Sequence, residues 1–308
     1  MSLLDFFANH TYRMVFFGTM TIGLVAGALG SFAYLRRQSL ISDVISHAAL
    51  PGTLIAFLAA AFVGADGRNM IGLLLGAVLM GTAAVGFANG VAAVSKIPID
   101  TAMAISLTIF FGAGMLLLRV VTDGAFAGKG GIQDYLFGNA SVITVADLIT
   151  SLVVGVLALG LMIVFWKEFA LRTFDPAHST VLGFGPRTID ALMFTTIVIA
   201  TVIGLKAVGL VLMVAFVVTP PATARQWTHT LAGMVTLSAV FGAVGSGIGA
   251  YASIALGRVP TGPLIVLTLF VMFVISLLVS PRRSIITRLR ARHRALAELR
   301  RDAGVGVR

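Results

Sequence analysis

The sequence predicts an all-α, polytopic integral membrane protein, built as a bundle of eight to nine transmembrane helices. Of its 308 residues, 58% are hydrophobic and only 11% are charged, whereas soluble domains carry roughly 25% charged residues. Apolar runs of about 20 residues, the length that crosses roughly 30 Å of hydrocarbon, recur from residue 14 almost to residue 280. Because lipid offers the backbone no hydrogen-bond partners, such runs are expected to be helical.

Charged residues, glycine and proline divide the chain into nine apolar segments. They cover residues 14–35, 41–63, 70–95, 100–121, 146–166, 189–205, 207–225, 231–256 and 262–280. Only Lys206 and Gly209 separate the sixth segment from the seventh, so this pair is either two spans or one span plus a broken or re-entrant helix. The first segment is longer than a signal-peptide core and ends in Leu35-Arg36-Arg37 instead of a cleavage site, so we expect it to be retained.

The formal net charge of +10 is concentrated near the C-terminus. Residues 281–308 hold nine Arg against Glu298 and Asp302, which is +7 of the +10 and leaves +3 for residues 1–280. This pattern indicates a basic tail beside a membrane, in reach of anionic lipid headgroups, and not a nucleic-acid-binding protein. We therefore predict a transmembrane domain over 1–280 and a basic cytoplasmic tail over 281–308.

The distribution of Lys and Arg between loops predicts the orientation. With nine spans, sixteen of the 22 Lys and Arg fall on the side of the tail and the remaining six on the other side. The positive-inside rule then predicts an external N-terminus and a cytoplasmic C-terminus. With eight spans the N-terminus would change sides.

Several signatures of other protein classes are missing. The chain has no cysteine, which excludes disulfides, thiolate metal sites and cysteine redox catalysis. It contains neither H-E-x-x-H nor G-x-S-x-G. The glycine-rich segment 124–130 has the wrong spacing for a phosphate-binding loop, and no Ser or Thr follows Lys129. We predict that the chain is not an enzyme and that another subunit hydrolyses any ATP used.

Some glycines are spaced four residues apart within the apolar segments. Small residues at this spacing let helix backbones approach closely in lipid. We interpret them as packing positions without a specific function. The pairs are Gly23 and Gly27, Gly72 and Gly76, Gly86 and Gly90, and Gly245 and Gly249.

Asp43 and His47 stand out because they lie four residues apart near the start of the second segment. At 3.6 residues per turn they share one helix face, so both side chains can reach one ion or each other. Ser39 and Ser46 fall close to this face, and Pro51 removes one backbone hydrogen bond a turn later. A carboxylate oxygen and an imidazole nitrogen are suitable ligands for Mn²⁺, Fe²⁺ or Zn²⁺.

A structural interpretation of this pair is also open. Asp43 would then stabilise the helix N-terminus, and His47 would hydrogen-bond a neighbouring helix. Ionisable residues are costly within a membrane and commonly functional there, which favours the metal interpretation. Two ligands are too few for a tight site, and a second copy of the chain across a two-fold axis would supply two more. The pair therefore suggests a dimeric pore.

Two connections, 122–145 and 167–188, are too long for simple turns. In the second, Asp175 can cap a short helix that has Pro176 at its first position, and Gly183 can end it after roughly two turns. This helix is either a docking element for a cytoplasmic partner or an ordinary capped linker. Its apolar side chains available for contact are Val181, Leu182 and Phe184.

A set of motifs extends along the chain. The first is Leu35-Arg36-Arg37-Gln38-Ser39-Leu40-Ile41-Ser42-Asp43, which continues to Ser46-His47-Ala48 and Leu50-Pro51-Gly52. The others are Tyr135-Leu136-Phe137-Gly138, Thr173-Phe174-Asp175-Pro176 with Leu182-Gly183, Val208-Gly209-Leu210-Val211-Leu212, Thr219-Pro220-Pro221-Ala222-Thr223-Ala224-Arg225 and Pro260-Thr261-Gly262-Pro263. This ordered set, over roughly residues 14–280, resembles the membrane permease subunits of manganese, zinc and iron ABC importers, the ABC-3 family served by cluster A-I binding proteins. The family commonly has Gly-Asp at Ser42-Asp43, and the arginine tail is outside the shared pattern.

The resemblance implies a fold like that of type II ABC importer permeases, in a bacterial plasma (inner) membrane. The cargo would be Mn²⁺ or Zn²⁺, with Fe²⁺ as a further candidate, and no cofactor would be bound stably. The implied partners are cytoplasmic ABC ATPase subunits, an extracytoplasmic metal-binding protein and a second permease copy in a homodimer or heterodimer.

The resemblance also assigns roles to residues. Asp43 and His47 would lie on the metal path. The segment 167–188 would couple to the ATPase through Asp175, Pro176, Leu182, Gly183 and Arg187. Two alternatives remain: an ion-coupled secondary metal transporter in which Asp43 and His47 relay protons, and a membrane scaffold that transports nothing.

Overall fold

The computed structural model describes residues 9–36, 40–64, 69–124, 126, 144–209, 213–257 and 259–280. Over these residues the regular secondary structure is entirely helical, which confirms the all-α prediction for them. The helices are α2 (His10–Leu35), α3 (Ile41–Phe62), α4 (Met70–Val94), α5 (Ile99–Asp123), α7 (Val145–Val164), α8 (Trp166–Phe174), α9 (Pro176–Val181), α10 (Pro186–Val208), α11 (Met213–Ala224), α12 (Leu231–Leu256) and α13 (Thr261–Val279).

Six helices are long and apolar enough to cross a membrane among the residues described: α2, α3, α4, α5, α12 and α13. α7 joins them as a seventh if it is taken together with α8, which follows at a bend of 67°. α11 has only 12 residues, and a helix of that length spans roughly 18 Å. It is therefore too short to cross alone, which agrees with a broken or re-entrant seventh segment. The total of eight to nine spans stays a prediction.

Local sequence sets the helix ends. The side chain of Asn9 accepts a hydrogen bond from the backbone N–H of Thr11 at 3.0 Å, and that of Thr230 accepts one from Gly233 at 3.2 Å. Both satisfy donors that the first turn of a helix leaves free. α12 ends at Gly257, whose φ of 75° suits glycine at a helix C-terminus.

α2 crosses α12 at close range because both helices carry glycine at the crossing. A methyl group on Gly23 would overlap Gly242, and one on Gly27 would overlap the backbone of Ser238. The Ser31 hydroxyl lies within hydrogen-bond distance of the Ser238 hydroxyl, 3.1 Å away and buried between the same two helices. The small-residue prediction is therefore confirmed for Gly23 and Gly27, and α2 and α12 are antiparallel.

The other glycine pairs behave unequally. Gly76 lies directly against Gly52 of α3, and Gly245 and Gly249 lie against α13. In contrast, a methyl group on Gly72, Gly86 or Gly90 would meet nothing within 4 Å. For these three the predicted close packing is not found among the described residues, because spacing alone does not tell which helix face has a neighbour.

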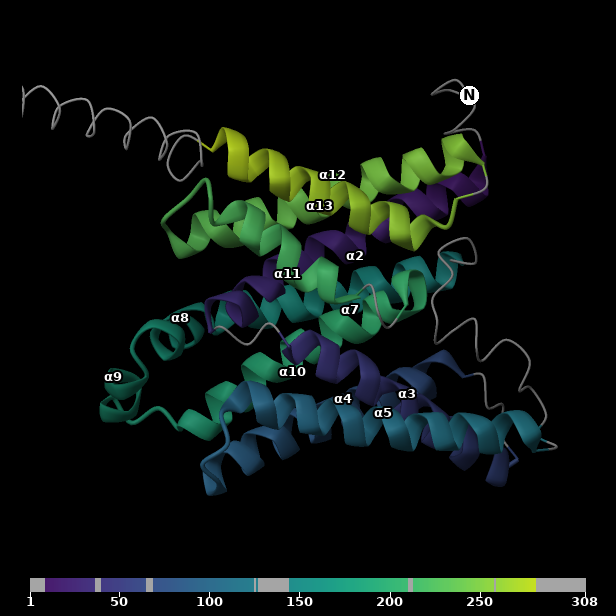
Figure 1. The fold of residues 1–308 in the computed structure, drawn as a ribbon, viewed down its shortest axis with the longest axis horizontal. Helices are drawn as coiled ribbons and strands as arrows, with labels where there is room; N and C mark the ends of the chain where they lie inside the picture. The colour runs from purple at the N-terminus through teal and green to yellow at the C-terminus, as the bar shows by residue number, and fades with distance from the viewer. Residues whose placement is uncertain are drawn as a thin grey trace, which may run out of the picture.

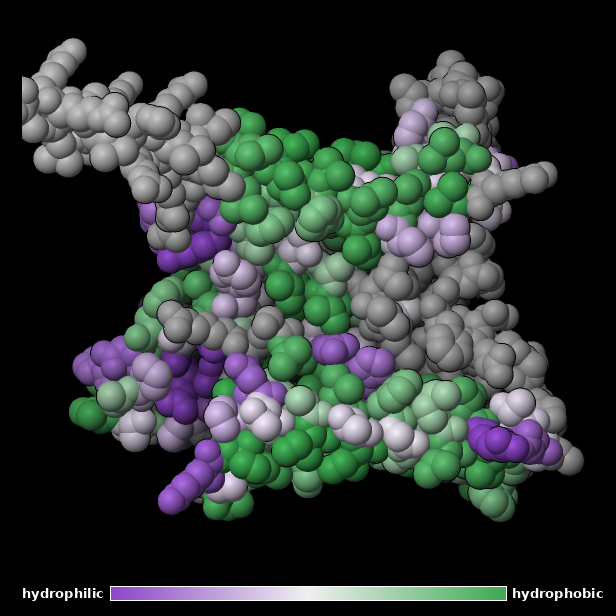
Figure 2. Space-filling model, in the orientation of Figure 1, coloured by the Kyte–Doolittle hydropathy of each residue, from purple (hydrophilic) through white to green (hydrophobic). Residues whose placement is uncertain are grey.

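The helices lie roughly along one direction, so the molecule has two ends (Figure 1). The end of α2, α8, α9 and the start of α10 share one of them, which we call the α8 end, and α3 begins further inside the bundle (Figure 1). Polar residues gather over α8 and α9, whereas apolar side chains cover much of the visible flank (Figure 2). Exposed apolar side chains on α4, α5, α7 and α13 include Leu79, Leu116, Leu157 and Leu267. Such a surface suits lipid as its solvent.

Candidate functional site

Asp43 and His47 lie in the first two turns of α3, on one face as their spacing predicts. Nε2 of His47 is 3.3 Å from Oδ1 of Asp43. The side chains keep 15% of their surface exposed for His47 and 28% for Asp43. The pair is thus largely removed from solvent but remains open on one side.

Unpartnered polar atoms surround this pair. Nδ1 of His47 and the hydroxyls of Ser42 and Ser46 are buried and have no hydrogen-bond partner among the residues that the structure describes. The ring of Phe111, from α5, packs edge-on against the His47 ring at a centroid distance of 4.7 Å. Buried polar groups in native proteins nearly always have a partner, so such a cluster points to a ligand or water that joins it. The start of α3 is therefore the best candidate binding position.

Because of Pro51, the backbone carbonyl of His47 is one more free hydrogen-bond acceptor beside the pair. α3 runs through Pro51 without ending, and proline has no N–H to donate to the carbonyl of His47 four residues earlier. The Thr53 hydroxyl bonds the carbonyls of Ala49 and Leu50, at 3.0 and 2.9 Å. The carbonyl of His47 thus lacks its helical donor at the level of the candidate site.

The described part of the chain does not supply a complete metal site. Within the part of the chain that the structure describes, no cluster of three or more His, Cys, Asp or Glu could hold a metal ion. A carboxylate and an imidazole can bind a divalent ion, but tight sites use four or more ligands. The arrangement fits an ion in passage or one shared with a second protein chain.

The predicted short helix in 167–188 is present as α9, next to α8 at the same end of the molecule. The carboxylate of Asp175 accepts a hydrogen bond from the backbone N–H of His178 at 2.9 Å, and Pro176 is the first helical residue. Gly183 has a φ of 81°, which suits a glycine that ends a helix. Val181 is 82% exposed, and Leu182 also projects outward. The prediction of a capped short helix is confirmed. Its apolar side chains are exposed on a part of the surface that is otherwise polar.

Some predicted positions lie outside the described residues. They include Ser39, the Tyr135-Leu136-Phe137-Gly138 motif, the side chain of Arg187 and the basic tail 281–308.

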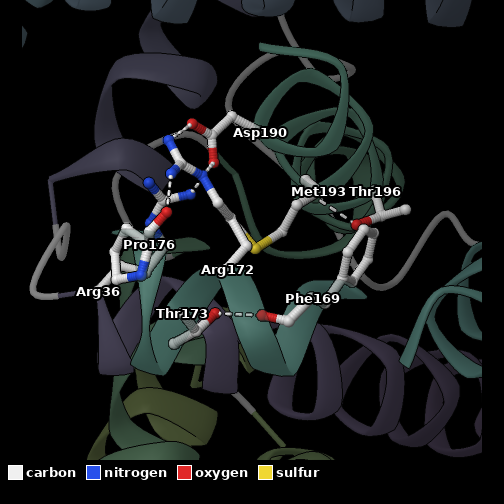
Figure 3. A network of polar contacts seen from close by, with 8 residues as sticks. All are labelled: Arg36, Phe169, Arg172, Thr173, Pro176, Asp190, Met193 and Thr196. Carbon is white, nitrogen blue, oxygen red and sulfur yellow. Dashed lines mark hydrogen bonds and ion pairs between the residues drawn. The ribbon is translucent and has the colours of Figure 1, made fainter. Parts of the chain in front are cut away.

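Sequence reasoning missed a network around Asp190. Arg36 Nη1 donates to Asp190 Oδ1 at 2.6 Å. Arg172 donates through Nε to Oδ1 at 3.0 Å and through Nη2 to Oδ2 at 2.7 Å. One carboxylate thus joins the end of α2, the last turn of α8 and the start of α10 (Figure 3). The arginine in the Leu35-Arg36-Arg37 motif was the only sequence signal for it.

Hydrogen bonds and charge attraction favour the charged forms of the side chains in this network. The hydrogen bonds to Asp190 raise the pKa of Arg172 above its ordinary value, and bidentate pairing of a guanidinium with a carboxylate is among the strongest side-chain contacts. The guanidinium of Arg36 also lies over the Phe194 ring of α10, 5.2 Å from its centroid. Arg36 therefore holds α10 through two contacts.

Comparison with known proteins identifies the family. The family model described as the ABC 3 transport family matches residues 9–280. The chain belongs to this family. It is 39% identical over 293 residues to the zinc transport system membrane protein TroC of Treponema pallidum, covering 95% of this chain and 97% of TroC. It is a multi-pass membrane protein, as its apolar helices predict.

Two further relatives extend the comparison. The manganese transport system membrane protein MntC of Bacillus subtilis is 38% identical over 273 residues, which is 89% of this chain and 62% of MntC. Among solved structures, PsaBC from Streptococcus pneumoniae in complex with Fab is similar with a TM-score of 0.79 and 29% identity, over 92% of this chain and 98% of that chain.

Proposed function

We propose that this chain is the transmembrane permease subunit of an ABC importer for divalent metal ions. Mn²⁺ is the first candidate cargo, and Zn²⁺ and Fe²⁺ are the others. The observation that carries the proposal is the Asp43–His47 pair at the head of α3, beside buried polar atoms that have no partner within the described part of the chain. The relatives of this chain are named for manganese and zinc transport.

The chemistry of the pair fits transient binding. Mn²⁺ and Zn²⁺ accept carboxylate and imidazole ligands, and neutral His47 would bind through one ring nitrogen while Asp43 offsets the ionic charge. Few ligands from one chain mean that the ion can leave again, which import requires. A second copy of the permease, identical or a sister chain, would bring a matching pair across a two-fold axis. The transport cycle would expose this position to one side of the membrane at a time.

The α8 end would face the cytoplasm and the ATPase. Basic residues favour the cytoplasmic side of short loops. Trp227 follows the end of α11, and its indole N–H donates to the Ser276 hydroxyl near the end of α13 at 2.6 Å. The end of α13 therefore lies beside Arg225, one of the basic residues near the α8 end, and the C-terminus would also be cytoplasmic. The extracytoplasmic metal-binding protein would dock at the opposite end. Basic residues at or near the α8 end are Arg36, Lys96, Lys167, Arg172 and Arg225.

The coupling segment would be 167–188, with α8 and α9 resting on the ATPase. Asp175 and Pro176 would start α9, Gly183 would end it, and Leu182 would face the partner; Arg187 would belong to the same coupling segment. The exposed apolar side chains of Val181 and Leu182 support this assignment, because free apolar groups outside the membrane mark protein contacts. The secondary-transporter alternative is less favoured, since the chain belongs to an ABC transport family.

The test of the function is metal accumulation. The chain would be expressed with its cognate ATPase and binding protein in cells lacking their own manganese and zinc importers. We expect cellular Mn²⁺ or Zn²⁺, measured by mass spectrometry, to rise only when all three proteins are present. Unchanged Mn²⁺, Zn²⁺ and Fe²⁺ with the assembled complex in the membrane would contradict the proposal.

The coupling segment yields a separate prediction. Val181→Asp should weaken co-purification of the ATPase, because a charge replaces an apolar contact that the partner would bury. The matched control is Val63→Asp at the opposite end of the bundle, where Val63 is also exposed, at 84%. Affinity purification followed by immunoblotting measures the bound ATPase. Equal ATPase recovery with both variants would count against docking at α9.

A further inference from the structure

The Asp190 network connects two parts of the molecule that have separate tasks in the proposed function. Arg172 lies in α8, within the segment assigned to ATPase contact, and its Nη1 also approaches the carbonyl of Pro176 at 3.4 Å. Pro176 is the first residue of α9. Arg172 is thus hydrogen-bonded both to the start of α9 and to Asp190 of α10 (Figure 3). A displacement of α9 would act on Asp190 through one side chain.

On its other side, the network leads to the Asp43–His47 pair. Arg36 is the residue at which α2 ends, and α3 begins at Ile41, two residues before Asp43. Ile41, Val44 and Ile45 are fully buried, so the first turn of α3 is packed tightly in the core, where α3 also contacts α10. We call Arg36 and the first turn of α3, residues 41–44, the α2–α3 corner. Asp190 reaches Arg36 directly and reaches the start of α3 through α10, which packs against α3.

The geometry allows the two arginines to respond to each other. Arg36 Nη1 and Arg172 Nε both donate to the same atom, Oδ1 of Asp190, at 2.6 and 3.0 Å. All three side chains are mostly shielded from solvent, where a charge-assisted contact is strong and a lost partner is costly. Because the two arginines share one oxygen, a shift of Arg172 changes the strength of the hydrogen bond between Arg36 and Asp190.

We propose that Asp190 is a positioning residue that couples α8–α9 to the α2–α3 corner, so that displacement of α9 by the ATPase reaches Asp43 and His47. This inference rests on the proposed function. A static brace is the competing explanation of the same contacts. A brace would change stability and assembly, whereas a coupling residue changes how much metal moves per ATP hydrolysed.

The experiment compares ATP hydrolysis and ⁵⁴Mn²⁺ uptake in proteoliposomes that hold the complete complex. Asp190→Asn keeps the size of the side chain but removes the charge that both arginines share. We expect uptake per ATP to fall roughly ten-fold or more, the factor that one charge-assisted hydrogen bond contributes to an equilibrium. Hydrolysis should stay within about two-fold of wild type, because the ATPase itself is unchanged. Asp190→Glu should restore most of the coupling.

Arg36→Gln is the second variant, because it leaves the Arg172–Asp190 contact and α8 intact. It should show the same uncoupling as Asp190→Asn. The matched control is Arg119→Gln, which breaks the exposed Arg119–Asp123 ion pair at the other end of the bundle and should leave uptake per ATP unchanged. Mn²⁺ binding to the assembled complex, measured by electron paramagnetic resonance, should persist in all variants, since none touches the metal pair.

The outcomes distinguish a failure of the coupling inference from a failure of the proposed function. Wild-type uptake per ATP in Arg36→Gln and Asp190→Asn overturns the coupling inference, and so does a parallel loss of hydrolysis and uptake in both, which is the signature of a brace. If Asp190→Asn does not assemble, Arg36→Gln alone decides. A wild-type complex that binds ATP but moves no metal contradicts the proposed function instead.

Discussion

Asp43→Asn is expected to abolish metal uptake while the chain still reaches the membrane. The substitution removes the one negative charge beside His47 on this face of α3 and replaces a carboxylate ligand by a neutral, weaker amide oxygen. The loss should exceed the roughly 10- to 100-fold that removal of a mere supporting group costs a metal site. His47→Ala should have a similar effect. Uptake of ⁵⁴Mn²⁺ by cells that express the complete transporter measures it.

The control for this prediction is Asp123→Asn, an exposed carboxylate at the other end of the bundle. It should leave uptake unchanged, which separates a specific role from a general effect of charge. An immunoblot of the membrane fraction shows whether each variant is present at the normal level. Wild-type uptake by both Asp43→Asn and His47→Ala at that level would leave the pair with a structural role only.

Gly23→Val is expected to prevent stable folding. Any side chain at this position would overlap the Gly242 carbonyl and the Ser246 hydroxyl of α12. Backbone cannot move aside as a flexible side chain does, so the two helices must separate. We expect a loss of about 3 kcal/mol or more, at the upper end for overpacking in a core. Size-exclusion profiles in detergent and thermal unfolding measure the effect.

Gly72→Val is the matched control, because it changes the same residue type in another apolar helix with nothing within 4 Å. It carries the same change in helix propensity but no overlap. A monodisperse, wild-type-like profile for Gly72→Val beside an aggregated Gly23→Val is the expected pair of results. Equal stability of the two variants would mean that α2 and α12 do not cross as described.

Much of the fold followed from the sequence because lipid imposes a simple rule on apolar segments. The segment 231–256 became α12 with the same ends, and 41–63 became α3, one residue shorter. Asp175 and Gly183 predicted α9 because caps act locally. The shared face of Asp43 and His47 needed only helix geometry.

What the sequence could not provide is pairing over long distances. Asp190 meets Arg36 from 154 positions away, and no periodic pattern encodes such a contact. A carboxylate near a helix start is adequately explained by the helix dipole, so nothing prompted a search for partners. Likewise, Gly86 and Gly90 have the same spacing as Gly23 and Gly27, but of these two pairs only the latter faces a neighbouring helix among the described residues.

The most direct test of the central claim is uptake into liposomes with and without the ATPase. The purified chain would be reconstituted alone, and also with the cognate ATPase, the metal-binding protein and ATP. We predict that ⁵⁴Mn²⁺ enters only with the complete set and that Asp43→Asn blocks this entry. Uptake by the chain alone, driven by a proton or sodium gradient and independent of ATP, would contradict the account and identify an ion-coupled secondary transporter.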